Sequence, residues 1–288
     1  GEPLLTPDII NHVKAIVAEN GSNAWWELPV EDLLPEPYTA DADFYIKGTD
    51  TMDVWFDSGS SWAAVQEALG SPVDLYLEGQ DQHRGWFQSS LITSVAVRGR
   101  APYKAVMTHG FCVDENGRKM SKSIGNVIDP KAIIEGGSDQ KKNPAFGADV
   151  LRLWVASVDF TYDVAISQSI MNSVAENVRK IRNRFRFMLG CIHDFDPDMD
   201  AIAFADLPLL DQHVIHQAQA AFDQVSEAYS AYAFSRASKT LIEFMQDISA
   251  FYLDAAKDRL YISAQGSFRR RSCQTVLHWL AENLARAV

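Results

Sequence analysis

Cysteine is scarce in this chain of 288 residues, which has only Cys112, Cys191 and Cys273, all far apart in the sequence. No two of them form the closely spaced Cys-x-x-Cys pair of a structural zinc site, and three scattered thiols do not make a disulfide framework. We therefore expect no zinc site in this chain and a reducing, cytoplasmic environment.

Long apolar runs are also missing. No stretch approaches the ~18 uninterrupted apolar residues that a membrane-spanning helix needs. No basic segment followed by an apolar one opens the chain, so we expect neither an export signal nor a membrane partner. Because the first residue is Gly1 and not Met, we also expect the chain to begin inside a longer polypeptide or at a cloning boundary.

Positive charge is in short supply, since 26 Lys and Arg face 38 Asp and Glu and the formal net charge is −12. This balance excludes a protein that coats nucleic acid non-specifically, but it is compatible with a local basic patch. Residues 1–166 carry a net charge of −11 and residues 167–288 only −1, and Gly266 is the only glycine or proline beyond Pro208. The sequence therefore predicts two domains, 1–166 and 167–288.

Turn signals divide the first domain into short elements. Thr6 followed by Pro7 predicts a helix start, and the apolar stripe that follows ends at Gly21. The other predicted elements are strands over 73–77 and 105–108, a helix over about 82–97 and a hairpin turn at 114–117. This order predicts a doubly wound parallel α/β sheet, in which ligands bind at the carboxyl ends of the strands.

Apolar residues in the second domain recur at helical spacing. One stripe consists of Val174, Val178, Ile181, Phe185 and Met188. Comparable stripes run through about 209–231, 234–262 and 273–288. Four amphipathic helices with short connections predict an all-α helical bundle.

A basic, glycine-flanked segment at residues 117–126 carries the sharpest chemical signal. Lys119 and Lys122 are three residues apart, and the small or flexible residues around them suit a mobile loop that binds a polyphosphate. For a generic pair of lysines at this spacing, a solvated basic turn is the better interpretation. The whole string Lys-Met-Ser-Lys-Ser, residues 119–123, is not generic, because it resembles the signature loop of class I aminoacyl-tRNA synthetases.

A second segment follows the predicted strand 73–77 and suits a nucleotide. Gly79 allows a ligand to approach the backbone closely, and the start of a helix offers free N–H groups to an anion. Glu78, Asp81 and Gln82 supply acceptors and an amide for ribose hydroxyls, an α-ammonium group or an adenine edge. Taken alone, an acidic strand end with Asp81 as a helix cap explains these residues equally well.

A third segment, residues 53–62, places Trp55 and Phe56 beside a tight Asp-Ser-Gly turn. An isolated aromatic pair of this kind is more often part of the core. The three segments together resemble the isoleucyl-tRNA synthetases, a class I family, and the similarity extends over essentially the full chain. It includes residues 108–111, 126–127, 149–154 and 179–186. The alternatives are a sibling synthetase for valine, leucine or methionine, and a non-catalytic tRNA- or partner-binding module derived from a synthetase.

The resemblance implies that residues 1–166 form the second half of a Rossmann-type catalytic domain. The activity implied is ATP-dependent conversion of isoleucine to isoleucyl-adenylate and transfer to tRNA(Ile), with ATP bound as its Mg2+ complex. Lys122 matches the family's ATP-contacting lysine, Lys119 its neighbour, and Glu78 the adenylate-binding carboxylate. Further nucleotide contacts are implied at Gly79, Asp81, Gln82, His109, Gly110, Met120, Ser121 and Ser123. Trp55 and Trp86 match positions that line the isoleucine side chain.

Several parts of the family's pattern are not found in this chain. They are the hydrolytic editing domain, the His-x-Gly-His signature of the first catalytic half and the carboxyl-terminal zinc module. His12, His83 and His109 do not form that signature. We therefore expect the isolated chain to be inactive, because half of the ATP site is missing. The resemblance separately implies that the full-length protein is a monomer.

Residues 167–288 resemble a truncated helical anticodon-binding domain. Residues 174–190 carry a net charge of +4, with Glu176 as the one acid. The basic residues of this cluster are Arg179, Lys180, Arg182, Arg184 and Arg186. The resemblance implies that they contact tRNA phosphates, although a solvated helix face is the simpler interpretation of the residues alone. The run 269–271, three arginines, is a weaker candidate of the same kind.

Overall fold

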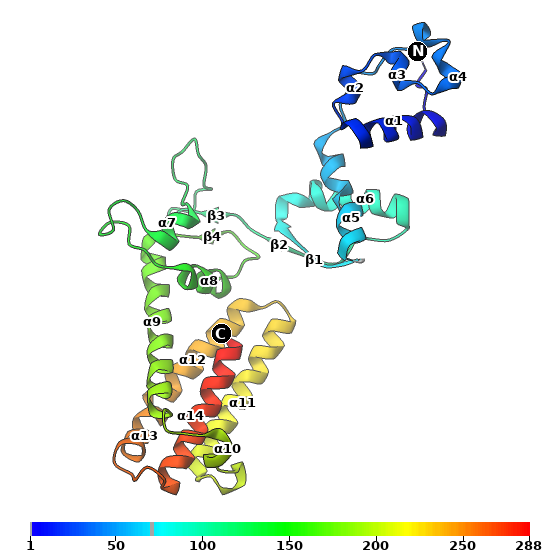
Figure 1. The fold of residues 1–288 in the computed structure, drawn as a ribbon. Coiled ribbons are helices and arrows are strands. Elements are labelled where there is room, and N and C mark those ends of the chain that lie inside the picture. The colour runs from blue at the N-terminus through cyan, green and yellow to red at the C-terminus, as the bar shows by residue number, and fades with distance from the viewer. Residues whose placement is uncertain (1, 70–71) are drawn as a thin grey trace.

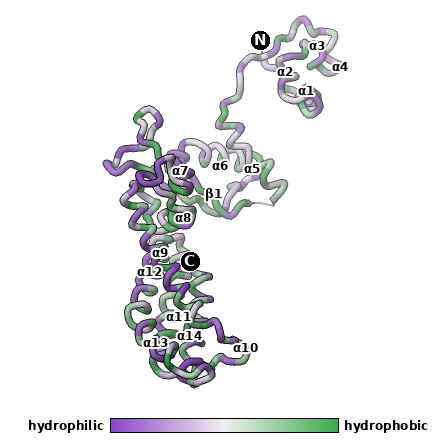
Figure 2. The backbone as a smooth tube through the Cα atoms, turned by 60° about the vertical axis from the view of Figure 1, so that its left-hand side comes forward, coloured by the Kyte–Doolittle hydropathy of each residue, from purple (hydrophilic) through white to green (hydrophobic). Residues whose placement is uncertain are grey.

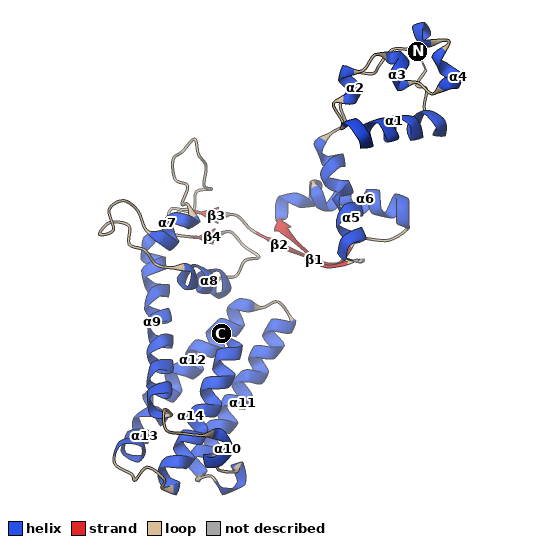
Figure 3. Ribbon diagram, in the orientation of Figure 1, coloured by secondary structure: helices blue, strands red, loops and turns tan. Residues whose placement is uncertain are grey.

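The computed structural model describes residues 2–69 and 72–288, and it has three regions in chain order (Figure 1). Short helices lie at the amino terminus, two small parallel sheets with their helices follow, and long helices form a bundle at the carboxyl end. Figure 3 shows that most of the chain is helical and that the strands are short. An α/β part followed by an all-α bundle confirms the predicted fold class.

The amino-terminal region is built around α1 (Pro7–Asn20), which begins as predicted. The Thr6 hydroxyl accepts a hydrogen bond from the Ile9 N–H, and Pro7 occupies the first turn, where no N–H is needed. Gly21 ends the helix with a φ of 81°, which favours glycine. The short elements that follow are α2 (Ala24–Glu27), α3 (Val30–Leu33), α4 (Glu36–Thr39) and the 3₁₀ helix η1 (Ala42–Phe44).

The first sheet consists of two parallel strands, β1 (Val73–Gly79) and β2 (Tyr103–His109), at the two predicted places. Three helical elements accompany it: α5 (Val54–Leu69), the 3₁₀ helix η2 (Gln80–Arg84) and α6 (Trp86–Arg98). The helix predicted over 82–97 therefore begins later, at Trp86. The reason is the backbone of Gly85, whose φ of −140° and ψ of −120° interrupt the helix.

Helices α5 and α6 pack closely because a glycine lies at their contact. A Cβ atom on Gly59 would come within 2.7 Å of the Ser89 Cβ. Trp62 Nε1 donates to Thr93 Oγ1 at 2.9 Å, and the Thr93 hydroxyl donates to the Gly59 carbonyl at 2.8 Å. These contacts fix the position of α5, which carries Trp55, against α6, which carries Trp86.

The second sheet pairs β3 (Cys112–Val113) with β4 (Val164–Ala165) in parallel. The predicted turn at 114–117 follows β3, and Gly117 adopts a φ of 74° there. Helices α7 (Pro130–Glu135) and α8 (Ala148–Ser157) lie next to this sheet. A small core that includes Val150, Trp154 and Met171 joins this region to the start of the bundle.

The bundle contains five long helices where four were predicted. They are α9 (Gln168–Cys191), α11 (Leu209–Ser230), α12 (Phe234–Ala250), α13 (Tyr252–Tyr261) and α14 (Phe268–Ala287), with the short elements α10 (Pro197–Asp200) and η3 (Phe204–Asp206) between the first two. The stripe predicted as one helix over 234–262 divides at Phe251, which ends α12 and precedes α13 with a φ of −117° and a ψ of −66°. Figure 2 shows hydrophobic and hydrophilic residues alternating along these helices, as amphipathic helices require.

The larger hydrophobic core lies inside this bundle. Met188, Ala218, Met245 and Leu277 are each fully buried in it. In the part of the chain that the structure describes, no helix is both long and apolar enough to cross a bilayer.

Candidate functional site

The ends of β1 and β2 bring four of the predicted nucleotide contacts together. The parallel register pairs Gly79 with His109, so Glu78 and Gly110 also lie at this edge. A Cβ atom on Gly79 would come within 2.5 Å of Asp81 Oδ1, so a larger residue there would displace the Asp81 carboxylate. Glu78 and His109 are exposed at this edge. A carboxylate and an imidazole therefore converge, beside two buried glycines, where a parallel sheet binds its ligands.

Gln82 is already engaged in the protein's own structure. Its Oε1 accepts a hydrogen bond from the Trp86 N–H at 3.0 Å and so caps the start of α6. This leaves the Nε2 group of Gln82 as the donor for a ligand. Asp81, the other acceptor of this turn, is exposed.

Trp86 and Trp55, the residues predicted to line an apolar side chain, begin α6 and α5, respectively, and the Trp55 ring lies beside Gly85 at the start of α6. The Trp86 ring stacks on Tyr76 with a centroid distance of 4.1 Å and an interplanar angle of 5°. Its Nε1 donates to the Ser58 carbonyl at 3.0 Å. Trp55 is 48% exposed, and its ring would lie 2.9 Å from a Cβ atom on Gly85. Trp86 is thus a fixed wall, whereas Trp55 offers an open apolar surface.

The lysine loop, residues 117–126, is held at its base by a carboxylate and an amide. Asp114 Oδ1 accepts from the N–H groups of Asn116 and Arg118 at 2.9 Å each, and Asp114 Oδ2 accepts from Asn126 Nδ2 at 3.0 Å. The hydrogen bond from Asn126 is the main reason why the pKa of Asp114 lies below its ordinary value. Asn126 Oδ1 in turn accepts from the Ser121 N–H at 2.9 Å.

Asp114 and Asn126 hold the base of the lysine loop, a position that the sequence motifs did not identify. Asp and Asn side chains commonly bond to nearby backbone groups in turns. The sequence signal that could have identified these two residues was therefore their position on either side of the lysine loop.

The two lysines of the loop differ in their surroundings. Lys119 Nζ lies 3.6 Å from the centre of the Phe111 ring, a cation–π contact. Lys122 is exposed and forms no ion pair with a described residue. The neighbouring hydroxyls of Ser121 and Ser123 are 2.6 Å apart, and Met120 packs against the small core below the loop. The loop lies between β3 and α7 (Figure 1), and no hydrogen bond between described residues joins it to Glu78.

The predicted basic cluster on α9 is spread around the helix and partly paired. Arg179 forms a two-pronged pair with Glu176 at 2.9 and 2.6 Å, and Lys180 lies 3.9 Å from the same carboxylate. Arg182 pairs with Asp149 of α8 at 2.5 Å. The two arginines that remain, Arg184 and Arg186, are half-buried and exposed, respectively.

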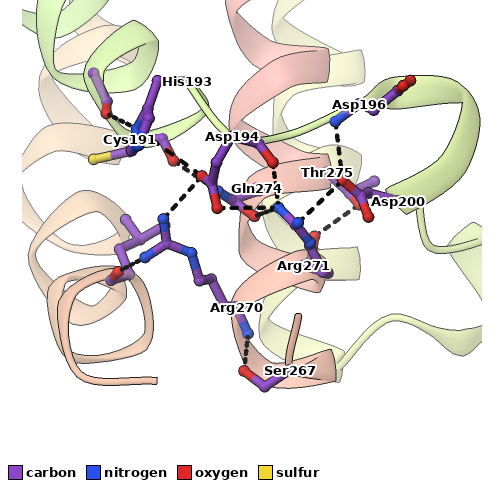
Figure 4. A network of polar contacts seen from close by, with 12 residues as sticks. Cys191, His193, Asp194, Asp196, Asp200, Ser267, Arg270, Arg271, Gln274 and Thr275 are labelled. Carbon is purple, nitrogen blue, oxygen red and sulfur yellow. Dashed lines mark hydrogen bonds and ion pairs between the residues drawn. The ribbon is translucent and has the colours of Figure 1, made fainter. Parts of the chain in front are cut away.

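The arginine run at 269–271 is not the free basic patch that the sequence indicated. Arg270 and Arg271 converge on Asp194 from α14, at 2.9 and 3.4 Å (Figure 4). Gln274 Nε2 donates to the same carboxylate at 2.7 Å, and Arg271 also pairs with Asp200 at 3.2 Å. Both guanidinium groups are mostly buried, so they hold the 192–200 segment on α14.

Asp194 makes this network sensitive to pH. Burial alone would raise its pKa, but hydrogen bonds from Arg270 and Gln274 outweigh that effect and lower the pKa from 3.8 to about 2. Because the folded pKa lies below the unfolded one, the stabilisation is complete above about pH 4 and is lost as the pH falls through about 2.

We expect Asp194→Asn to lower the free energy of unfolding at pH 7, and the difference from the parent chain to shrink below about pH 4. Urea unfolding followed by circular dichroism between pH 3 and 7 measures this. Asp198→Asn is the control, because Asp198 is exposed on the same segment. An Asp194→Asn deficit that stays constant over this pH range would contradict the assignment.

Comparisons with known proteins match two separate parts of the chain. The profile of the family "tRNA synthetases class I (I, L, M and V)" matches residues 1–167, more than half of the chain. The chain belongs to this class I tRNA synthetase family. A second profile, "Anticodon-binding domain of tRNA ligase", matches residues 211–288. The synthetase resemblance drawn from the lysine loop and the strand ends is thereby confirmed.

Curated members of the family are similar along the whole chain. An isoleucine–tRNA ligase of Rippkaea orientalis is 60% identical over 291 residues, which are 100% of this chain and 30% of that protein. One from Cyanothece sp. is 59% identical over 293 residues, again 100% of this chain and 31% of the relative. The chain thus spans about 30% of the length of these synthetases.

Solved synthetase structures share the fold at low identity. A LeuRS–tRNA–LeuAMS complex from Agrobacterium radiobacter K84 has a TM-score of 0.66 at 18% identity, covering 83% of this chain and 30% of that one. A methionyl-tRNA synthetase from Mycobacterium tuberculosis, in complex with methionyl-adenylate, has a TM-score of 0.62 at 18% identity, covering 97% of this chain and 58% of that one.

Proposed function

We propose that this chain is a functional part of an isoleucine–tRNA ligase. Residues 1–166 would be the second half of its catalytic domain, and residues 167–288 part of its anticodon-binding domain. The observation that carries the proposal is the 57–60% identity to isoleucine–tRNA ligases over 100% of the chain. This identity favours isoleucine over valine, leucine or methionine as the substrate.

The site residues have complementary tasks in this proposal. Glu78 and the neighbouring backbone of Gly79 and Gly110 hold the adenylate, with Asp81, Gln82 and His109 around it. Lys122, with Lys119 beside it, neutralises the phosphates of ATP, which binds as its Mg2+ complex. Negative charge builds on the leaving pyrophosphate as the isoleucine carboxylate attacks the α-phosphorus, and positioned cations lower that barrier. Met120, Ser121 and Ser123 shape the loop, and no covalent enzyme intermediate is needed.

Specificity for isoleucine would come from Trp55 and Trp86. Trp86 is fixed by its stacking on Tyr76, and the partly exposed Trp55 closes the other side of the apolar wall. An apolar pocket discriminates poorly against a substrate that lacks one methylene, which is worth only about 1–3 kcal/mol; the isoleucine enzyme is itself the standard illustration of this limit. Correction of such errors would then need another part of the protein.

The partners in this proposal are isoleucine, ATP and tRNA(Ile), with the basic residues of α9 on the tRNA side. Methionyl-adenylate and tRNA are bound by two of the solved relatives, which agrees with this substrate set. We also propose that the complete ligase is a cytoplasmic monomer.

A chimera tests the proposal directly. In it, residues 1–288 replace the matching segment of the Rippkaea orientalis ligase, which supplies the rest of the enzyme. We expect isoleucine-dependent ATP–pyrophosphate exchange within about tenfold of the natural ligase, whereas the isolated chain should show none because positioning is most of what this reaction needs. A well-folded chimera without exchange would favour the non-catalytic binding module instead.

A further inference from the structure

A groove of about 320 Å³ lies between α9 and the corner where α12 meets α13. Arg179, Lys180 and Arg184 line it from α9, and Lys257 lines it from α13. Asp254 is the one carboxylate in its wall. The groove is lined by four cations and one acid, so it is locally basic in a chain whose net charge is −12.

This groove lies partly outside the regions that the family profiles describe. The profiles match residues 1–167 and 211–288, and α9 lies between them. The motifs of the sequence also gave no role to Lys257. The groove therefore combines basic residues of α9, which the resemblance places on the tRNA side, with Lys257 of α13, to which it gave no role.

Arg184 is the one cation of this groove that forms no ion pair with a described residue. Its Nε atom is buried and has no hydrogen-bond partner in the part of the chain that the structure describes. Burial lowers the pKa of its guanidinium group, which means that the charged form is poorly solvated there. A poorly solvated charge is costly, and an anion bound beside the guanidinium group in the groove would offset that cost.

The other cations of the groove are available to a ligand. Lys257 pairs with Asp254 at 2.7 Å, but these side chains are 50% and 69% exposed. Arg179 and Lys180 share Glu176, and their side chains are also more than half exposed. Exposed pairs contribute little to stability, so an incoming anion can displace their carboxylates at small cost.

We propose that this groove binds phosphate groups of the tRNA backbone, with Arg184 and Lys257 as its anchors on opposite walls. The inference rests on the proposed function, in which tRNA is a substrate. It reduces the set of α9 residues that line the proposed phosphate site, because Arg182 is paired with Asp149 of α8 and Arg186 does not line the groove. It also adds α13 to the contact surface.

Fluorescence anisotropy with the 288-residue chain and a labelled isoleucine tRNA transcript tests this inference, with KCl varied between about 50 and 300 mM. We expect Lys257→Ala and Arg184→Gln each to weaken binding about tenfold at low salt. Each should also reduce the slope of log affinity against log salt by about one, because one phosphate contact is lost. Asp254→Asn should tighten binding, because it removes the repulsive carboxylate.

Lys239→Ala is the matched control, since it removes one positive charge from an exposed position of α12 that does not line the groove. Circular dichroism checks the fold of each variant, and the exposed positions Lys257 and Asp254 carry the test if Arg184→Gln is unstable. Wild-type affinity in both of those variants, or an equal loss of affinity in Lys239→Ala, would contradict phosphate binding in this groove. ATP–pyrophosphate exchange by the chimera involves no tRNA, so its loss would instead refute the proposed function.

Discussion

Lys122→Ala in the chimeric ligase is expected to slow ATP–pyrophosphate exchange by on the order of a hundredfold or more, with a much smaller change in the KM for ATP. Lys122 is exposed, and positive φ angles at Gly117 and Gly125 flank its loop. The ammonium group is thus free to reach phosphates whose charge grows during the reaction. Initial rates at saturating isoleucine and varied ATP separate the two kinetic constants.

The control for this experiment is Lys131→Ala. Lys131 is an exposed lysine on α7 whose contact with Glu135, at 3.8 Å, is loose. Removing it changes the net charge by the same amount without touching the loop. An exchange rate in Lys122→Ala that equals that of Lys131→Ala would remove Lys122 from the catalytic machinery.

The elements predicted correctly from the sequence are those whose signals are local. Thr6, Pro7 and Gly21 act on backbone groups within one helical turn, and the structure shows the cap and the stop that they imply. The strands around 73–77 and 105–108 lie between turn residues in the sequence, which made their positions visible. Their parallel pairing then determined that Glu78 and His109 share one edge.

The break between α12 and α13 had no such signal. Phe251 is neither glycine nor proline, and the apolar stripe continues through it at helical spacing. Periodicity alone therefore predicted one helix over 234–262. The structure interrupts the helix at Phe251 with a φ of −117°, and a pattern of apolar residues does not record such a local change of the backbone.

The ion-pair partners of the arginines could not be predicted from short stretches of the sequence either. Arg182 finds Asp149 at a distance of 33 residues in the sequence, and Arg270 finds Asp194 at 76. Charge counting over a short window treats all of these groups as free. Only the fold shows that Arg270 is structural and that Arg184 is left with a buried donor unpaired.

The bundle depends on a buried ion pair for which helical periodicity also gave no indication. Asp211 in the first turn of α11 is fully buried and accepts two hydrogen bonds from Arg259 of α13, at 2.7 and 2.5 Å. The Tyr252 hydroxyl donates to the same carboxylate at 2.7 Å. Arg259 also donates to Ser272 Oγ at 2.8 Å, which ties α14 into the network. Burial, first of all, raises the pKa of Tyr252, so its hydroxyl stays protonated as a donor.

Removal of one partner from this pair is expected to lower the free energy of unfolding by far more than the intact pair contributes to it. Asp211→Ala leaves the Arg259 guanidinium buried without a counter-charge, and a loss of about 3–5 kcal/mol in the free energy of unfolding is expected. Urea unfolding of the 288-residue chain, followed by the helical circular dichroism signal, measures it. Asp211→Asn, which keeps the shape and one acceptor, should lose less.

Glu227→Ala provides the comparison, because it breaks the exposed pair with Arg236, whose atoms are 3.4 Å apart and whose side chains are 74% and 53% exposed. Such a surface pair is worth about 0–1 kcal/mol. If Asp211→Ala cost no more than Glu227→Ala, water would have to reach Arg259 in the variant. The junction of α11, α13 and α14 would then be an open, solvated contact, and the groove on α13 would lack the rigid support that a fixed phosphate site requires.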